Sequence, residues 1–151
     1  MLAAAVAAGQ SVSPAGITQR TIGELETRKT DGAIVRYALS PADHVVGGDQ
    51  LVYTVEIRNT TNRSVGQVVA ISPIPGRMSY VAGSAAGPGC EIDFSVDGGT
   101  SFGKPEDLVI ALPAGKARPA AAADYTHIRW RLKFPLSASA IAYARFRALL
   151  K

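Results

Sequence analysis

The sequence predicts an all-β protein, an antiparallel β-sandwich of roughly seven to nine strands. Three observations lead to this fold class. Apolar side chains recur at every second residue from Leu51 to Ile57, which is the period of a half-buried strand. Two segments near the C-terminus, 126–136 and 140–150, alternate in the same way. The 15 Gly and 9 Pro residues interrupt the chain often, which favours short strands over long helices.

Residues 1–20 are interpreted as a leader remnant or a disordered tail, and residues 21–151 as a single β-sandwich domain. The first eight residues are small and apolar, like the end of a secretory signal peptide, but no basic segment precedes them. A chain of 151 residues is long enough for one domain with a buried core. Since no run reaches the ~18 apolar residues of a membrane span, we expect no transmembrane segment.

Turn residues divide the domain into candidate strands. Asp31-Gly32 is a tight-turn signal, because Gly adopts positive φ without strain. Pro73 and Pro75 cannot donate to a strand ladder and mark an edge or a crossing between sheets. Between Pro113 and Asp124 the chain holds only Ala, Gly, Pro and basic residues, and we expect a surface loop there. The candidate strands are residues 21–29, 33–40, 51–58, 68–72, 78–82, 90–96, 108–112, 126–136 and 140–150.

The segment 90–96 places acidic side chains on one face. Together with Asp97, the carboxylates of Glu91 and Asp93 could approach a calcium ion, but they lack the spacing of a dedicated calcium loop. We therefore expect a solvated acidic hairpin. Cys90 is the single cysteine, which excludes an intramolecular disulfide framework and a multi-thiolate metal site. No metal site and no cofactor are predicted.

Basic residues are concentrated in the C-terminal third. After residue 108, eight Lys and Arg residues accompany a single acidic residue, Asp124. If the last two strands neighbour each other, their outward faces form one basic ribbon, which either pairs with acidic neighbours or binds an external anion. The acidic neighbours considered are Glu24, Glu26 and Glu56. The candidate anion-binding residues are Arg129, Arg131, Lys133, Arg145 and Arg147.

The stretch from Gly48 to Ser84, followed by a Trp-containing strand and a final alternating strand, resembles a known bacterial family. It is similar to the extracellular repeat domain catalogued as domain of unknown function eleven. The resemblance implies an immunoglobulin-like β-sandwich, export to the cell envelope and no catalytic residues. The residues that carry it are Gly48, Asp49, Tyr53, Thr54, Val55, Asn59, Val68, Val69, Pro75, Tyr80, Val81, Gly83, Ser84 and Trp130.

The sequence contains none of the common local enzyme motifs, such as a nucleophile elbow, a phosphate-binding loop or a zinc-protease helix. With His44 and His127 as its only histidines, a histidine-based triad is disfavoured. The sequence therefore predicts a non-catalytic bacterial module that is secreted, periplasmic or on the cell surface. We expect a structural or interaction role, in which envelope components or other proteins bind through its sheet edges. The alternative is an anion-binding module for acidic glycan, lipopolysaccharide or nucleic acid, which uses the basic C-terminal strands.

Overall fold

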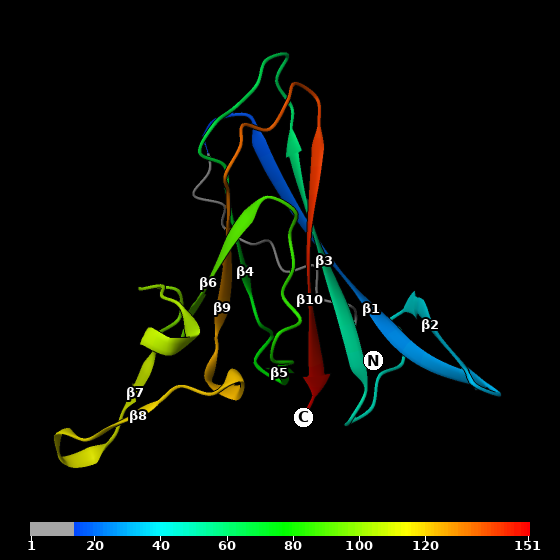
Figure 1. Cartoon of the computed structure of the whole chain (residues 1–151), viewed down its shortest axis with the longest axis vertical. Coiled ribbons are helices and arrows are strands. Elements are labelled where there is room, and N and C mark those ends of the chain that lie inside the picture. Colours follow the sequence, from blue (N-terminus) through cyan, green and yellow to red (C-terminus); the bar gives the residue numbers. More distant parts are fainter. Residues whose placement is uncertain (1–13) are drawn as a thin grey trace.

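The computed structural model describes residues 14–151 and confirms an all-β antiparallel sandwich. Its five-stranded sheet has the order β2-β1-β3-β10-β5, and its three-stranded sheet the order β4-β9-β6. Figure 1 shows these sheets as two facing layers, with β1, β3 and β10 in one and β4, β6 and β9 in the other. A separate hairpin pairs β7 with β8. The strands are β1 (Ile17–Asp31), β2 (Ile34–Pro41), β3 (Gln50–Asn59), β4 (Val69–Pro73), β5 (Met78–Tyr80), β6 (Cys90–Ser95), β7 (Val109–Ala111), β8 (Ala117–Pro119), β9 (His127–Leu132) and β10 (Ile141–Leu150).

The long alternating strand β3 lies at the centre of the larger sheet, as its pattern predicts. It pairs with β1 on one side and β10 on the other. Leu51, Tyr53, Val55 and Ile57 face the core and are buried. Val52 faces the other way and is nevertheless buried, because it lies between the long side chains of Glu24 in β1 and Arg147 in β10. β3 is therefore covered on both faces near its start.

Aromatic side chains connect the two sheets. Trp130 of β9 is fully buried, and its ring lies 6.1 Å from that of Phe146 in β10. Phe146 in turn stacks on Tyr53 of β3, with ring centroids 4.9 Å apart. Gly23 of β1 lies directly opposite Tyr53, and a Cβ at this position would stand 2.9 Å from the Tyr53 ring. A glycine here leaves space for the ring on the inner face of the sheet.

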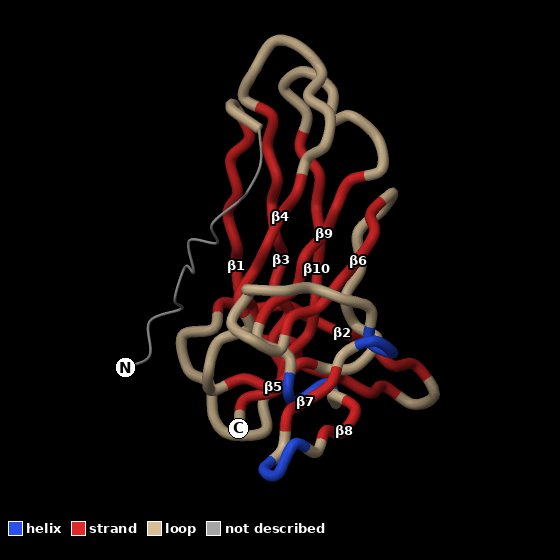
Figure 2. The backbone as a smooth tube through the Cα atoms, turned by 90° about the vertical axis from the view of Figure 1, so that its left-hand side faces the viewer, coloured by secondary structure: helices blue, strands red, loops and turns tan. Residues whose placement is uncertain are grey.

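Asn59 fixes the end of β3. It is fully buried, and its side-chain Nδ2 lies 2.8 to 3.1 Å from the carbonyl oxygens of Arg63, Leu136 and Ser137. Its Oδ1 accepts hydrogen bonds from the N–H and hydroxyl of Thr61. One side chain thus ties the loop after β3 to the loop before β10. Figure 2 shows the loops of this end gathered together.

The first strand begins earlier than expected. β1 starts at Ile17 rather than Thr21, and residues 17–20 pair with β3. Ile17 is buried in the core, so these four residues belong to the sandwich and not to the tail. The predicted leader remnant otherwise lies outside the described residues, except for residues 14–16. No helix within residues 14–151 is long and apolar enough to cross a membrane.

Two hairpins project from opposite sides of the sandwich (Figure 1). One is formed by β2 and the second half of β1, which turn at Asp31-Gly32 as predicted. The other is formed by β7 and β8. β8 lies within the stretch 113–124 that was expected to be a loop. It pairs with β7 because Ala114 and Gly115 have positive φ and turn the chain back, so that the Leu112 N–H donates to the Lys116 carbonyl at 2.8 Å. Residues 14–151 thus contain ten strands, one more than the expected range.

Candidate interaction surfaces

The predicted anion-binding residues do not form one surface. β9 lies in the three-stranded sheet and β10 in the five-stranded sheet. Arg129 and Arg131 alternate with buried residues of β9, and Arg145 and Arg147 alternate with buried residues of β10. The two pairs consequently point away from the core on opposite faces of the sandwich, while Lys133 follows the end of β9. The single basic ribbon is not formed, because the link between β9 and β10 crosses from one sheet to the other.

A buried carboxylate pairs with the basic residues of β9. Asp93 in β6 is 3 % exposed, and Lys104, Arg129 and Arg131 each place a nitrogen 2.9 Å from its carboxylate oxygens. Desolvation raises the pKa of Asp93, but the hydrogen bonds from Lys104 and Arg129 and the charge of Arg131 outweigh it and hold the pKa below its ordinary value. Glu91 makes a more exposed ion pair with Arg131.

Of the three acidic residues expected in a solvated hairpin, Glu91 and Asp97 are exposed. Asp93 is buried instead, because the loop after β6 folds back over the sheet. Asp97 closes this loop by accepting hydrogen bonds from the N–H and hydroxyl of Ser101, and these bonds hold its pKa well below the ordinary range. The ring of Phe102 then lies 4.5 Å from the Arg129 guanidinium, a cation–π contact. The loop shields Asp93 from water.

On the opposite face, Arg147 pairs with Glu26. Arg147 Nε and a terminal guanidinium nitrogen each lie 2.9 Å from the Glu26 carboxylate, whose side chain is 5 % exposed. The hydrogen bond from Arg147 lowers the pKa of Glu26, desolvation opposes it, and Gln50 and the charge of Arg145 lower it further. Glu26 is one of the acidic neighbours that the sequence suggested for the basic strands.

The two remaining predicted residues are isolated from each other. Within residues 14–151, Lys133 and Arg145 make no ion pair. Lys133 borders a shallow, polar hollow of about 500 Å³ together with Gln67, Glu91 and Arg131, while Arg145 lies on the other sheet. The hollow contains two basic side chains and one acidic one, and Arg131 is already paired with Glu91 and Asp93, so it does not present a concentrated positive charge.

Sheet edges are the second kind of surface that the sequence suggested. Three of the four outermost strands of the two sandwich sheets are short or covered. The second half of β1 is also unpaired on its β3 side, but its residues 27–31 are all polar or charged. β5 has three residues. β6 is covered by the returning loop, where Phe94 and Gly103 exchange two backbone hydrogen bonds. β4 has five residues and ends at a proline, and the side-chain amide of Gln19 donates to its Ile71 carbonyl at 2.8 Å. These are the usual ways in which proteins protect strand edges.

The fourth edge, β2, is long, apolar and uncovered. It has eight residues at the end of the five-stranded sheet, and no other segment within residues 14–151 pairs with its outer side. Its large apolar side chains are between 40 % and 63 % exposed: Ile34, Val35, Tyr37 and Leu39. Such an edge offers unpaired backbone groups and apolar contacts to another strand. We call this surface the β2 edge.

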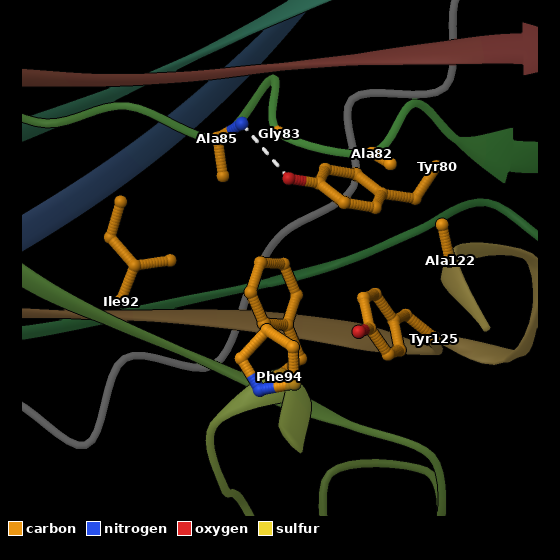
Figure 3. A pocket seen from close by; sticks show the side chains of 9 residues that line it. Tyr80, Ala82, Gly83, Ala85, Ile92, Phe94, Ala122 and Tyr125 are labelled. Atoms are coloured by element: carbon orange, nitrogen blue, oxygen red, sulfur yellow. Dashed lines mark hydrogen bonds between the residues drawn. The ribbon is translucent and has the colours of Figure 1, made fainter. Parts of the chain in front are cut away.

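An apolar pocket of about 410 Å³ opens beside β6 (Figure 3). The rings of Tyr80, Phe94 and Tyr125 lie against one another with centroids 4.5 to 5.7 Å apart, so no further ring fits between them. The free space lies next to them, toward Ile92 and Ala85. The Tyr80 hydroxyl accepts a hydrogen bond from the Ala85 N–H at 3.0 Å. None of the described residues that line the pocket is charged, so its walls suit only small uncharged groups.

The described residues show no arrangement for metal chemistry: none of their His, Cys, Asp and Glu side chains gather in groups of three or more that could hold an ion. Cys90 begins β6 and is partly buried against the core, and desolvation raises the pKa of its thiol. Comparison with known proteins gave no family model, no curated protein and no solved structure that matches this chain.

The sequence identified the hairpin that contains β2 but not the exposure of its edge. In β2, apolar residues occupy both faces, as Ile34 and Ala38 alternate with Val35, Tyr37 and Leu39. That pattern is typical of a strand buried on both faces. The sequence shows only that β2 follows a tight turn near the start of the domain. Both edge strands and central strands occur in that position, so the sequence could not identify β2 as an edge.

Proposed function

We propose that this protein is a non-catalytic interaction module, exported to the bacterial envelope or secreted, whose β2 edge binds an extended segment of a partner protein. The observation that carries the proposal is the contrast between β2 and the other sheet edges. The other three outermost strands are short or covered and the unpaired part of β1 is polar, whereas β2 is eight residues long, apolar and exposed on both faces.

Strand addition to a free edge is a recurring mode of peptide recognition, in which backbone hydrogen bonds provide affinity and alternate side chains provide specificity. The hairpin position of β2 favours it, because the projecting strand is accessible from both faces. Export rests on the pattern from Gly48 to Ser84 and on the apolar first residues.

The geometry supports the anion-binding alternative less well. Arg129, Arg131 and Arg147 are engaged with Asp93 and Glu26 inside the protein, and binding an external anion requires breaking these ion pairs. The two remaining cations, Lys133 and Arg145, lie on different sheets. A partner bound at the β2 edge requires no such rearrangement.

The proposal is tested by selecting peptides from a displayed random library on the folded full-length chain. Selected peptides are then compared on a variant with Val35→Asn and Leu39→Asn, and on a control variant with Val109→Asn and Leu112→Asn, which changes two similarly exposed apolar residues elsewhere. The two β2 side chains retain about two-fifths of their surface to bury. We expect them to contribute about 1 kcal/mol each, so the β2 variant binds roughly thirtyfold more weakly.

Binding should also slow hydrogen exchange of the β2 amides, because a paired edge no longer exposes them to water. Peptides that bind the β2 variant and the control variant equally well would contradict the proposal, as would a selection that yields no binders. Export is tested separately by fractionating the native host and measuring the mass of the mature protein. An unprocessed chain in the cytoplasm would refute that part.

A further inference from the structure

We infer that the strand pairing with the β2 edge carries an acidic residue opposite Arg36, with an apolar residue on each side of it. This inference rests on the proposed function, since it specifies the chemistry of the partner at the same edge. The recognised pattern is apolar, acidic, apolar, along the part of the partner that lies beside residues 35–37.

The first support is an unbalanced charge on the hairpin. Lys29 of β1 lies directly opposite Arg36 of β2, and both side chains are exposed. Like charges at directly opposed positions on a sheet are destabilising. Asp31 shares their face but lies opposite Ile34, two residues further along the hairpin, and within residues 14–151 neither cation makes an ion pair. A carboxylate beside Arg36 offsets the repulsion between the two cations.

The second support is the alternation of side chains along a strand. Arg36 faces one side of the hairpin, whereas Val35, Tyr37 and Leu39 face the other. In an added strand, a residue that meets Arg36 is flanked by two residues that point to the opposite face. Those two neighbours lie beside Val35 and Tyr37, where apolar side chains bury the most exposed apolar surface. Successive residues of the added strand therefore make the charge contact with Arg36 and the apolar contacts with Val35 and Tyr37.

The chain contains the same pairing in its own three-stranded sheet. Residues 128–130 of β9 have the order aliphatic, Arg, aromatic, the same order as residues 35–37 of β2. The neighbouring strand β6 places Asp93 opposite Arg129 and apolar residues opposite the two flanking positions. Arg129 and Asp93 form an ion pair at 2.9 Å. β6 is thus an internal template for the kind of strand that fits β2.

A second copy of this chain is a poorer partner for the same edge. β2 contains Arg36 and no acidic residue, so antiparallel pairing of two β2 strands adds positive charge to an edge that already has Lys29 beside Arg36. Residues 1–13, which lie outside the described part of the chain, also contain no Asp or Glu. Neither β2 of a second copy nor residues 1–13 supply the carboxylate, and Asp93 is held within the three-stranded sheet by its own ion pairs. We therefore assign the acidic strand to another protein.

The experiment uses a fluorescent peptide with the sequence of residues 90–97, carrying Cys90→Ser and Glu91→Gln, and a second peptide in which Asp93 is also replaced by Asn. Their affinities for the folded full-length chain are measured by fluorescence anisotropy. We expect the acidic peptide to bind about fivefold more tightly at low ionic strength, the upper range for an exposed charge pair. The preference should disappear at about 1 M salt, where the Debye length is about 3 Å.

Matched variants locate the effect. Arg36→Gln and Lys29→Gln should remove the preference for the acidic peptide, whereas Arg28→Gln, adjacent in the chain but on the other face, should keep it. Because Arg36 does not contact β9, a preference that persists in Arg36→Gln shows that the peptide has displaced β6 and overturns the inference. Equal binding of both peptides, with both weakened by Val35→Asn and Leu39→Asn, overturns the charge inference but leaves the proposed function standing.

Two further outcomes are decisive. If neither peptide binds, the inferred pattern is wrong, and the library selection decides separately whether the β2 edge binds any segment. If sedimentation equilibrium shows a dimer that Val35→Asn and Leu39→Asn convert to a monomer, a second copy occupies the edge, and the acidic partner strand is excluded.

Discussion

Replacing Asp93 by Ala tests whether its buried ion pairs hold the returning loop after β6 against the three-stranded sheet. The substitution leaves Lys104, Arg129 and Arg131 without their shared carboxylate. Removing one partner of a buried ion pair costs about 3–5 kcal/mol. The three cationic side chains are 27 % to 44 % exposed, so they regain part of their hydration. We therefore expect a loss of about 3 kcal/mol, near the lower end of that range.

The free energy of unfolding is measured by urea denaturation, with Glu91→Ala as the matched control. Glu91 also pairs with Arg131, but its side chain is 46 % exposed, and an exposed pair contributes at most about 1 kcal/mol. Both variants should keep the wild-type m-value, which reports the surface exposed on unfolding. If Asp93→Ala costs no more than Glu91→Ala, the ion pairs of Asp93 do not stabilise the returning loop.

Three other substitutions give independent tests. The low pKa of Asp93 means that its carboxylate stabilises the fold above its ordinary pKa of 3.8 and that this contribution is lost as the pH falls toward the native pKa. The stability difference between wild type and Asp93→Asn, measured by urea denaturation across pH, should therefore shrink below pH 3.8; a difference that grows on acidification would contradict this. Gly23→Ala should lower stability by about 1–3 kcal/mol, because the new Cβ stands 2.9 Å from the Tyr53 ring; an unchanged urea midpoint would refute the packing argument. Asn59→Asp should cost about 3 kcal/mol or more, because a buried carboxylate replaces the donor that faces three carbonyl oxygens; a thermal midpoint equal to that of wild type would show that these bonds contribute little.

The faces of the long strands could be predicted from the sequence, whereas their neighbours could not. Period-two alternation predicts that Trp130, Phe134 and Phe146 face the core. Trp130 and Phe146 do so, because the signal is contained within each strand, whereas Phe134 is 71 % exposed because β9 ends at Leu132. The pairing of strands depends on contacts between distant segments. β9 and β10 are consecutive in the chain, yet the link between them changes sheets, so the basic residues that looked adjacent lie on opposite faces.

The burial of Asp93 and the exposure of β2 were missed for the same physical reason. Each is decided by whether another segment covers the strand, and covering is not a local property of the sequence. Asp93 is covered because Asp97 and Ser101 turn the following loop back over β6. β2 has the apolar pattern of a covered strand, but the described chain supplies nothing to cover it.

The length of β1 has a consequence for how force passes through this molecule. Its 15 residues extend over about 50 Å at about 3.3 Å per residue. The first half is paired with β3 in the sandwich, and the second half is paired only with β2. A segment bound to β2 is therefore connected to the core by one continuous strand rather than by a flexible linker. Tension applied to such a segment along the strand direction is shared by the whole β1–β3 ladder, whose many hydrogen bonds must break together before the sandwich yields.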